Sequence, residues 1–558
     1  MGSHGTTSDS RNRPRIRPLG DLGLVVQVAD EAGDWRRVHG VARRIESMGC
    51  EGISEVVPAL DSVAVHLRRT AEWNLVAERV LGVLDGLVPE VGEGEVREIP
   101  VFYGGEAGAD LGRVARETGL SEAEVIERHA AGCYRVLALG FAPGFPYLAG
   151  LDEGLRCRRL ERPRTRVAAG SVGIGGVQTG VYPMELPGGW NLIGRTPLVM
   201  FDPAATPPNF LRPGDVVRFR ATGDGVDGAK EAVEAVEAVG GSGVLEVIDA
   251  GIVATVQDCG RVGYQSIGVA EGGAVDLRAL RVGNLLVGNP PEAAGLEWAL
   301  RGPKLVFVER RVVAVTGGRV AGVPAARPFV VEAGEVLDLS RMVAGLRGYL
   351  SIDGGIDVEE VMGSRGTCLA GGFGGWQGRA LEVGDVLPLG EGRIVSVEGG
   401  WWASPVLAGR IVPGAVRVRV MPGPEADWFG DTVWRRFLEG EYTVGSDSNR
   451  MGLRLTGEAL PLPGPLEMVS QPVVAGTVQV PGDGQPIVLM ADRQSLGGYP
   501  RLATVAAVDM AVMAQAGPGD RVQFVECDLV EAEALRLAEE KDFVVFEAAV
   551  TGRLVRKA

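Results

Sequence analysis

The sequence predicts a mainly β protein that begins with a small α+β domain. Three observations support this fold class. Residues 139–202 place a glycine or proline every few residues between β-branched and aromatic residues, which is typical of a small barrel or sandwich with ligand-sized loops. Part of that stretch occurs a second time near residue 475. Residues 20–100 instead alternate between strand and helix patterns.

The repeat combines two glycine motifs. Ala169–Ile174 (AGSVGI) is echoed by Ala475–Val480 (AGTVQV), and each copy is followed by a strand that opens with Pro-Gly-Asp. The motif glycine and the turn glycine are 44 residues apart in the first copy and 43 in the second. Matching order and separation favour a duplicated β unit. Weaker copies of the turn motif indicate a further unit between them, at 333–337 and 383–387.

The other elements follow from periodicity and caps. The α+β domain has the order βαββα, with expected strands and helices at 22–29, 35–48, 53–57, 62–67 and 72–87. A strand at 96–103 precedes a helix that opens with a capping box, Ser121 and Glu124. Further on we expect helices at 277–286, 427–438 and 531–541, and a strand at 543–550.

These patterns divide the chain into seven segments. A low-complexity stretch of Ala, Val, Glu and Gly is expected to be a linker, so the chain resembles a fusion of two modules. The segments are a polar tail (1–17), the α+β domain (18–100), a first barrel (101–222), the linker (223–243), two further β units (244–400 and 401–528) and a C-terminal extension (529–558).

Composition excludes several classes of function. The formal net charge of −16 argues against nucleic acid and against an anionic membrane surface. No apolar run is long enough for a membrane helix, and the six cysteines are scattered without metal-ligand spacing. We therefore expect a cytoplasmic protein with free thiols and no metal site.

Lysine and histidine are scarce, which narrows the chemistry. The four histidines all lie at or before residue 129, and none of the four lysines lies in a P-loop or a biotin-attachment motif. Arginines and backbone N–H groups must then bind anions, while carboxylates serve as general bases. No covalently bound biotin is expected.

The candidate site residues are polar groups on or near the glycine-rich loops. For acid/base catalysis they are Asp258, Asp276 and His129, although an Asx turn or a helix end explains such residues equally well. A nest of N–H groups is expected in the Gly170–Gly176 loop. The candidates for substrate or anion binding are Arg164, Ser171, Gly173, Gly175, Gln178, Arg195, Arg261, Gln265, Arg450, Asp492, Arg493 and Gln494.

Several long motifs resemble a known pair of families. GFAPGFPYLAGLD, GSVGIGGVQTGVYP and PGGWNLIGRTP resemble the sporulation kinase-inhibitor family, also called allophanate hydrolase subunit 1. QDCGRVGYQSIGV, PGPEADWF and QPIVLMADRQSLGGYP resemble its partner family, subunit 2. The resemblance implies cyclophilin-like β-barrels, one in the first module and two in the second. It does not imply allophanate hydrolysis, because the GGSSGG-type loop and catalytic lysine of that reaction are absent.

The same paired modules form the carboxyltransferase region of urea carboxylase and two of the three components of bacterial 5-oxoprolinase. The resemblance therefore implies a hydrolase that opens a small cyclic amide, 5-oxo-L-proline, to L-glutamate with ATP, with or without Mg. The remaining component of that enzyme, a separate partner protein of the LamB/YcsF type, would be required, and a homo-oligomer is left open. In this hypothesis Arg195 and the Gly170–Gly176 loop bind the anion, and Asp258 or Asp276 transfers protons.

Two other hypotheses remain. One is a biotin-dependent carboxyltransferase of a urea or amide carboxylase, and the other is a regulator that inhibits a histidine kinase. In each case we expect the ligand in a cleft between the first-module barrel and the second module, with Ser171 and Asp258 facing it.

Overall fold

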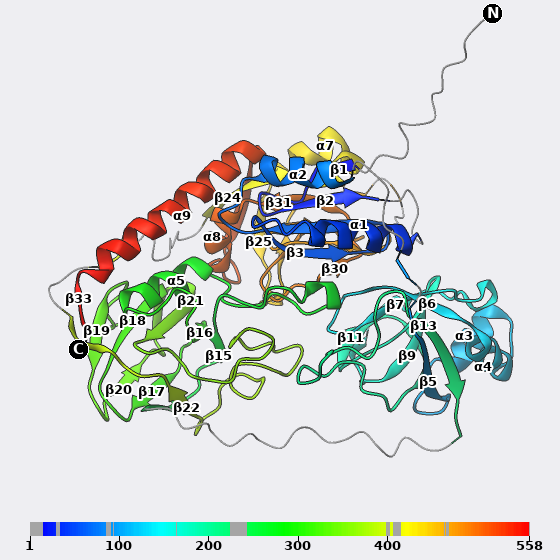
Figure 1. Cartoon of the computed structure of the whole chain (residues 1–558), viewed down its shortest axis with the longest axis horizontal. Helices are drawn as coiled ribbons and strands as arrows, with labels where there is room; N and C mark the ends of the chain where they lie inside the picture. The colour runs from blue at the N-terminus through cyan, green and yellow to red at the C-terminus, as the bar shows by residue number, and fades with distance from the viewer. Residues whose placement is uncertain are drawn as a thin grey trace, which may run out of the picture.

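The computed structural model describes residues 15–28, 34–84, 91–92, 94–162, 164–223, 243–397, 402–404, 415–462, 464 and 468–556. Residues 1–14 of the predicted tail and 224–242 of the predicted linker lie outside this description. Figure 1 shows the N-terminal domain in blue at the top, the first barrel at the right and the green middle unit at the lower left. Below, the first module is everything up to residue 223, and the second module begins at residue 243.

The N-terminal domain is an antiparallel sheet with the strand order β1-β2-β4-β3, covered by α1 and α2. The predicted βαββα order is confirmed, and β1 is an additional strand that starts inside the predicted tail. Strand β4 is buried on both faces, since Val63 and Val65 pack with the helices while Ala64 packs toward the first barrel. The elements are β1 Arg15–Pro18, β2 Gly23–Gln27, α1 Trp35–Ser47, β3 Ile53–Pro58, β4 Ser62–Leu67 and α2 Trp73–Leu84.

The first barrel is a closed sheet of seven strands around an apolar core. Helix α4 begins at the predicted capping box, in which Ser121 and Glu124 each accept the other's backbone N–H. The strands in chain order are β5 Val96–Tyr103, β6 Tyr134–Leu139, β7 Pro146–Ala149, β9 Ser171–Gly175, β10 Gln178–Val181, β12 Asn191–Arg195 and β13 Val216–Ala221. Outside the barrel lie α3 Leu111–Thr118, α4 Glu122–Ala131, η1 Glu153–Leu155 and the strand pair β8 Arg164–Val167 and β11 Leu186–Gly188.

The middle unit consists of two sheets that share one core. The predicted mainly β class is confirmed, but this unit has two separate sheets instead of one closed barrel, and the chain first passes from one sheet to the other at Gly251 (φ 74°). One sheet contains β14 Gly243–Asp249, β17 Lys304–Phe307, β20 Val336–Asp338 and β22 Val386–Leu389. The other contains β15 Val253–Gln257, β16 Gly295–Ala299, β18 Arg311–Val320, β19 Pro328–Val331 and β21 Met342–Ile352. The unit also carries η2 Gln265–Ile267, α5 Leu277–Leu286 and β23 Ile394–Val397.

The second barrel is again a closed sheet of seven strands. These are β24 Ala415–Pro422, β25 Glu441–Val444, β26 Gly452–Thr456, β28 Thr477–Gln479, β29 Ile487–Leu489, β31 Arg501–Val505 and β32 Arg521–Glu526. The remaining elements are α7 Ala426–Glu439, η3 Ala507–Asp509, α8 Met510–Ala514 and the strand pair β27 Gln471–Pro472 and β30 Leu496–Gly497.

The two barrels have the same topology, which supports the predicted duplication. In both, the first strand pairs in parallel with the last, as β5 with β13 and β24 with β32, and every other barrel pair is antiparallel. The strands correspond one to one in chain order, and each barrel carries one extra strand pair at the same place. The repeated glycine motifs lie at the start of β9 and of β28.

The repeated Pro-Gly-Asp turns also share their local structure. The aspartate accepts a hydrogen bond from the backbone N–H three residues earlier, at 2.9 Å for Asp215 and 2.8 Å for Asp520. The weaker copy at Asp385 has the same bond at 2.7 Å. In all three turns the preceding glycine has a φ of 91–93°, a left-handed conformation that favours glycine.

The C-terminal extension forms a single long helix, α9 Leu529–Thr551, followed by β33 Leu554–Arg556, which pairs with β23. Figure 1 shows α9 in red, running from the N-terminal domain to the middle unit. The prediction of a strand at 543–550 is wrong. Phe543 and Val550 are seven residues apart, and from one face of the helix both pack into an apolar cluster with α5 and β18.

Candidate functional site

The N-terminal domain, the middle unit and the second barrel meet at a pocket of about 180 Å³, which we call the interdomain pocket. Its lining comes from the turn between β1 and β2 (residues 19–22), from β3 and β4, from residues 259–277, and from second-barrel segments around β28 and β31 and after β29. Part of the wall is apolar, and titratable or polar side chains interrupt it at Glu55, His66, Gln265, Glu271 and Arg493. Because both modules contribute, the pocket depends on their association.

Glu55 connects the N-terminal domain to the middle unit. Its carboxylate accepts backbone N–H bonds from Gly263 (3.2 Å), Gln265 (2.5 Å) and Ser266 (3.2 Å), and a further bond from the Gln265 side-chain amide (3.0 Å). Burial raises the pKa of Glu55 and outweighs these donors, which lower it. The contact sets the position of the loop that contains η2.

Arg493 is the buried cation of the pocket. Its guanidinium donates to the Gln265 side-chain oxygen (2.9 Å) and lies 3.7 Å from Glu271, but its Nε has no hydrogen-bond partner. Burial lowers the pKa of Arg493. Burial, and secondarily the charge of Arg493, lower the pKa of His66 to about 3, so this imidazole is neutral at physiological pH.

Side chains of α9 pair with two charged residues that line the pocket. Arg536, which is fully buried, donates to Asp21 (3.2 Å), while Arg69 pairs with Glu539 and Glu540 at 2.6 Å each. These contacts neutralise Asp21 and Arg69, two pocket residues of the first module.

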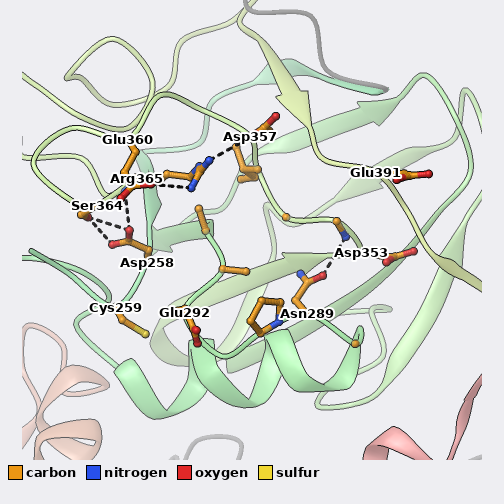
Figure 2. A pocket seen from close by; sticks show the side chains of 18 of the residues that line it. Asp258, Cys259, Asn289, Glu292, Asp353, Asp357, Glu360, Ser364, Arg365 and Glu391 are labelled. Atoms are coloured by element: carbon orange, nitrogen blue, oxygen red, sulfur yellow. Dashed lines mark hydrogen bonds and ion pairs between the residues drawn. The ribbon is translucent and has the colours of Figure 1, made fainter. Parts of the chain in front are cut away.

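The middle unit contains a larger pocket of about 520 Å³, the middle-unit pocket, which Figure 2 shows from close by. Its lining has far more negative than positive charge. Six carboxylates (Asp258, Glu292, Asp353, Asp357, Glu360 and Glu391) face two guanidinium groups (Arg365 and Arg393).

Asp258, a predicted catalytic residue, lines this pocket, but its carboxylate is already hydrogen-bonded within the protein. It accepts hydrogen bonds from the Ser364 hydroxyl (2.7 Å), the Arg365 N–H (2.6 Å) and the Gly260 N–H (2.9 Å). The Arg365 guanidinium in turn lies 3.3 Å from Asp357 and 3.5 Å from Glu360, and Figure 2 shows these partners around it. These bonds tie the loops after β15 and β21 together.

Asp276, another predicted catalytic residue, is fully buried at the start of α5. It accepts bonds from the Ala279 N–H (3.0 Å) and the Gln515 amide (3.0 Å), and burial raises its pKa. Close to it, the Tyr349 hydroxyl donates to Glu297 (2.8 Å). This cluster joins the middle unit to the second barrel.

Arg450 and Asp492 belong to the same junction. Arg450 donates to Asp492 at 2.8 and 2.9 Å, to the Gly273 carbonyl at 2.7 Å and to Glu297. Burial alone would raise the pKa of Glu297, but Arg450 and Arg347 outweigh it and hold that pKa below its usual value. Neither Arg450 nor Asp492 lines either pocket.

Arg261 is likewise fully buried. It donates to the carbonyls of Val361 (3.1 Å) and Gly366, and its guanidinium lies 5.0 Å from the Phe373 ring centroid. It therefore supports the 361–373 loop. Gln494 is half-buried beside Arg493 and lines neither pocket.

The candidates in the first barrel lie away from both pockets. Ser171, Gly173 and Gly175 belong to β9, which pairs with β10 and β12, so the predicted anion nest is instead a strand within the barrel. A Cβ on Gly175 would lie 2.5 Å from the Trp190 ring, which explains the glycine by packing. Gln178 opens β10 opposite Gly175.

The remaining charged candidates of this barrel have structural partners. Arg164 binds Asp110 (2.7 Å), and Arg195 donates to the Ala169 carbonyl (2.8 Å). His129 is fully buried, and burial lowers its pKa to about 3. Its Nε2 lies 2.9 Å from Thr179 and its Nδ1 lies 2.7 Å from the Tyr103 hydroxyl.

Of the predicted residues, the structure brings Gln265 and Arg493 together in the interdomain pocket. Glu55, His66 and Glu271 were missed. The available signal was a histidine and a glutamate inside two apolar strands, SVAVHL and ISEVVP, where a solvated polar residue is not expected.

The pocket also lies elsewhere than predicted, beside the N-terminal domain. The first barrel meets the second module mainly through apolar packing, in which Phe201 lies 5.8 Å from Phe373 between ring centroids. Ser171 lines neither pocket, so it does not share one with Asp258. Within the described residues, no helix is long and apolar enough to cross a membrane, and no three His, Cys, Asp or Glu are placed to hold a metal ion.

Comparison with family profiles matches both modules. Residues 14–211 match "Carboxyltransferase domain, subdomain C and D", and residues 267–526 match "Carboxyltransferase domain, subdomain A and B".

Curated relatives match the modules separately. The C subunit of 5-oxoprolinase from Escherichia coli K12 is 40% identical over 309 residues, covering 54% of this chain and 96% of that protein. The B subunit of 5-oxoprolinase from E. coli O157:H7 is 43% identical over 220 residues, covering 38% of this chain and 99% of that protein. Urea amidolyase of Lachancea kluyveri is 32% identical over 324 residues, covering 53% of this chain but 18% of that protein.

A solved structure, TTHA0988, matches both modules at once. It superposes with a TM-score of 0.80 at 34% identity, covering 92% of this chain and 100% of that chain.

Proposed function

Because the chain belongs to the family of carboxyltransferase-domain proteins that includes the B and C subunits of 5-oxoprolinase, we propose that it supplies both of these subunits in an ATP-dependent 5-oxoprolinase. One observation carries the proposal. The chain joins counterparts of two separate proteins, and the matches cover 99% of the B subunit and 96% of the C subunit. The proposed reaction opens 5-oxo-L-proline to L-glutamate and consumes ATP.

The interdomain pocket is the proposed substrate site, because both modules line it and ligands commonly bind between domains. A five-membered lactam is an unreactive amide. Transfer of the γ-phosphoryl group of ATP to the lactam oxygen releases ADP and gives a better electrophile. Water then adds to the lactam carbonyl carbon, and the C–N bond breaks to leave an acyl phosphate. A second water hydrolyses this acyl phosphate to glutamate and phosphate. In this scheme Arg493 offsets negative charge, neutral His66 exchanges hydrogen bonds with the substrate, and Glu55 positions the loop of Gln265.

The middle-unit pocket does not fit the phosphates of ATP. Six carboxylates outnumber two guanidinium groups there, so a polyphosphate would meet repulsion. We therefore propose that ATP binds on a partner protein of the LamB/YcsF type, the A component of 5-oxoprolinase, or at its interface with this chain.

The test is reconstitution. The purified chain is mixed with that partner, ATP and 5-oxoproline, and ADP and glutamate are followed. We expect both products to require both proteins, and Arg521→Gln, an exposed arginine paired with exposed Glu441, should retain activity. Products that form equally without this chain would overturn the proposal.

The second candidate is a carboxyltransferase of a urea or amide carboxylase, favoured by the profile descriptions and by the urea amidolyase match. It predicts that the chain accelerates transfer of CO2 from a biotinylated carrier protein to urea. This result, together with a blank lactam assay, would replace the first proposal.

A further inference from the structure

Two buried hydrogen-bonding groups of the interdomain pocket have no protein partner. They are Nε of Arg493 and Oγ1 of Thr504, and each residue is 2% exposed. Buried polar groups in folded proteins nearly always find a partner, and because both residues line the pocket, a ligand there can supply the missing hydrogen bonds.

The charges around the pocket indicate the sign of that ligand. Asp21 is matched by Arg536, and Arg69 by Glu539 and Glu540. Glu55 is surrounded by four N–H donors.

Of the two arginines that line the pocket, Arg493 has the weaker ion pair, because Arg69 lies 2.6 Å from each of two carboxylates. Its carboxylate neighbour Glu271 lies 3.7 Å away and is partly exposed, with 41% of its side chain accessible to solvent. Burial and the charge of Arg493 also keep His66 neutral, as expected at positive potential. The long distance to Glu271 and the unpartnered Nε make Arg493 the place in the pocket where an anion would gain a charged hydrogen bond.

The volume and polarity of the pocket restrict which anion it can bind. The pocket is about 180 Å³, and its remaining wall includes Leu19, Val275, Val474 and Met510. A small organic acid with an apolar ring or chain fits this combination better than a polyphosphate does.

We propose that the interdomain pocket binds the carboxylate of a small cyclic or branched organic acid, with Arg493 as its charged contact and the Thr504 hydroxyl as a second hydrogen-bonding group. The identification of this acid as 5-oxoproline rests on the proposed function. The carboxylate site itself rests only on the geometry of the pocket.

Calorimetric titration of the full chain with three probes tests the site. The probes are 5-oxoproline, cyclopentanecarboxylate, which keeps the acid without the lactam, and 2-pyrrolidinone, which keeps the lactam without the acid. We expect the two acids to compete for one site and 2-pyrrolidinone to bind at least about tenfold more weakly. Equal binding of all three probes would overturn the proposal.

Variants identify the contact. Arg493→Gln should weaken both acids about tenfold or more, whereas Arg521→Gln, on β32 of the same barrel, should bind them as the wild type does. An Arg493→Gln protein with unchanged affinity would overturn the assignment. If this variant does not fold, a crystal structure of the wild-type chain with cyclopentanecarboxylate decides, since density for the acid away from Arg493 contradicts the proposal.

The experiment separates the two proposals. Arg493-dependent binding of cyclopentanecarboxylate with a blank reconstitution assay supports the carboxylate site and overturns the 5-oxoprolinase assignment. If 5-oxoproline is turned over but binding of the acids does not depend on Arg493, the 5-oxoprolinase assignment is supported and the carboxylate site is overturned.

Discussion

The two barrels share one topology, but one pair of equivalent strands, β9 with β12 in the first barrel and β28 with β31 in the second, has different surroundings. In the first barrel, Arg195 pairs with Ser171 across β12 and β9, and its guanidinium satisfies the nearby Ala169 carbonyl. In the second, Thr504 takes the place of Arg195 and pairs with Thr477, but its hydroxyl is buried and unpartnered. The strand pairing is the same, so the difference arises from the residue type and from what covers the strands.

The cover of the second barrel is the N-terminal domain. A Cβ on Gly20 would lie 2.6 Å from the Thr504 methyl group, which shows how closely the two units approach. A duplicated β unit thus provides two similar strand pairs, and the pair that neighbouring units enclose lines the interdomain pocket.

The largest expected effect comes from breaking the junction between the second barrel and the middle unit. Arg450→Met leaves Glu297 buried without its closest cation, so we expect a loss of about 3–5 kcal/mol in the free energy of unfolding. Urea denaturation measures this loss. The exposed pair of Arg454 and Asp447 provides the control, because Arg454→Gln should cost less than about 1 kcal/mol.

The same variant has a pH signature. In the wild type the pKa of Glu297 is held below its usual value of 4.5, so its stabilising contribution is present above that pH and is lost as the pH falls. Without Arg450, burial should raise this pKa, and the variant should then lose stability as the pH rises through the new value. A variant that loses no more stability than Arg454→Gln, at any pH, would contradict this account of the junction.

A smaller effect is expected from the glycines of the first barrel. Gly175→Ala places a methyl group against the Trp190 ring, and such overpacking should cost about 1–3 kcal/mol. In the second barrel, Gly482 follows the equivalent position and has open space around it, so Gly482→Ala should change stability by less than about 0.5 kcal/mol. Thermal melts compare the two. Equal melting temperatures would show that Gly175 is not required for packing against Trp190.

Much of the fold could be predicted from local patterns. The motif spacing predicted the duplication, the capping box at Ser121 marked the start of α4, and the periodicity of 277–286 located α5. The strand expected at 543–550 is wrong because its valines favour a strand by local propensity, whereas packing of Phe543 and Val550 against α5 and β18 stabilises the helix.

The candidate site could be predicted only in part. Gln265 and Arg493 stand out on glycine-rich loops, but their partners depend on long-range contacts, and Glu55 is 210 residues from Gln265 in the sequence. The Gly170–Gly176 motif looked like an anion nest because the sequence does not show that Trp190 occupies the space beside Gly175. Packing and burial at a junction of three units depend on contacts between distant parts of the chain, so no single short motif predicts them.

The smallest expected effect comes from Thr504→Val, which tests the comparison of the two equivalent strand pairs directly. Thr504→Val keeps the shape of the side chain and removes a buried hydroxyl that lacks a partner, so the ligand-free chain should become more stable by up to about 1 kcal/mol. Affinity for cyclopentanecarboxylate should fall, because the ligand loses one hydrogen-bonding group. Arg195→Thr installs the second barrel's residue on the first, and it should change neither quantity by more than about 0.5 kcal/mol, since Arg195 is partly exposed and lines neither pocket. Thermal melts with and without the acid measure both effects. If Thr504→Val destabilises the chain but binds the acid normally, the hydroxyl stabilises the fold and does not bind the ligand. The two strand pairs then differ only in their packing.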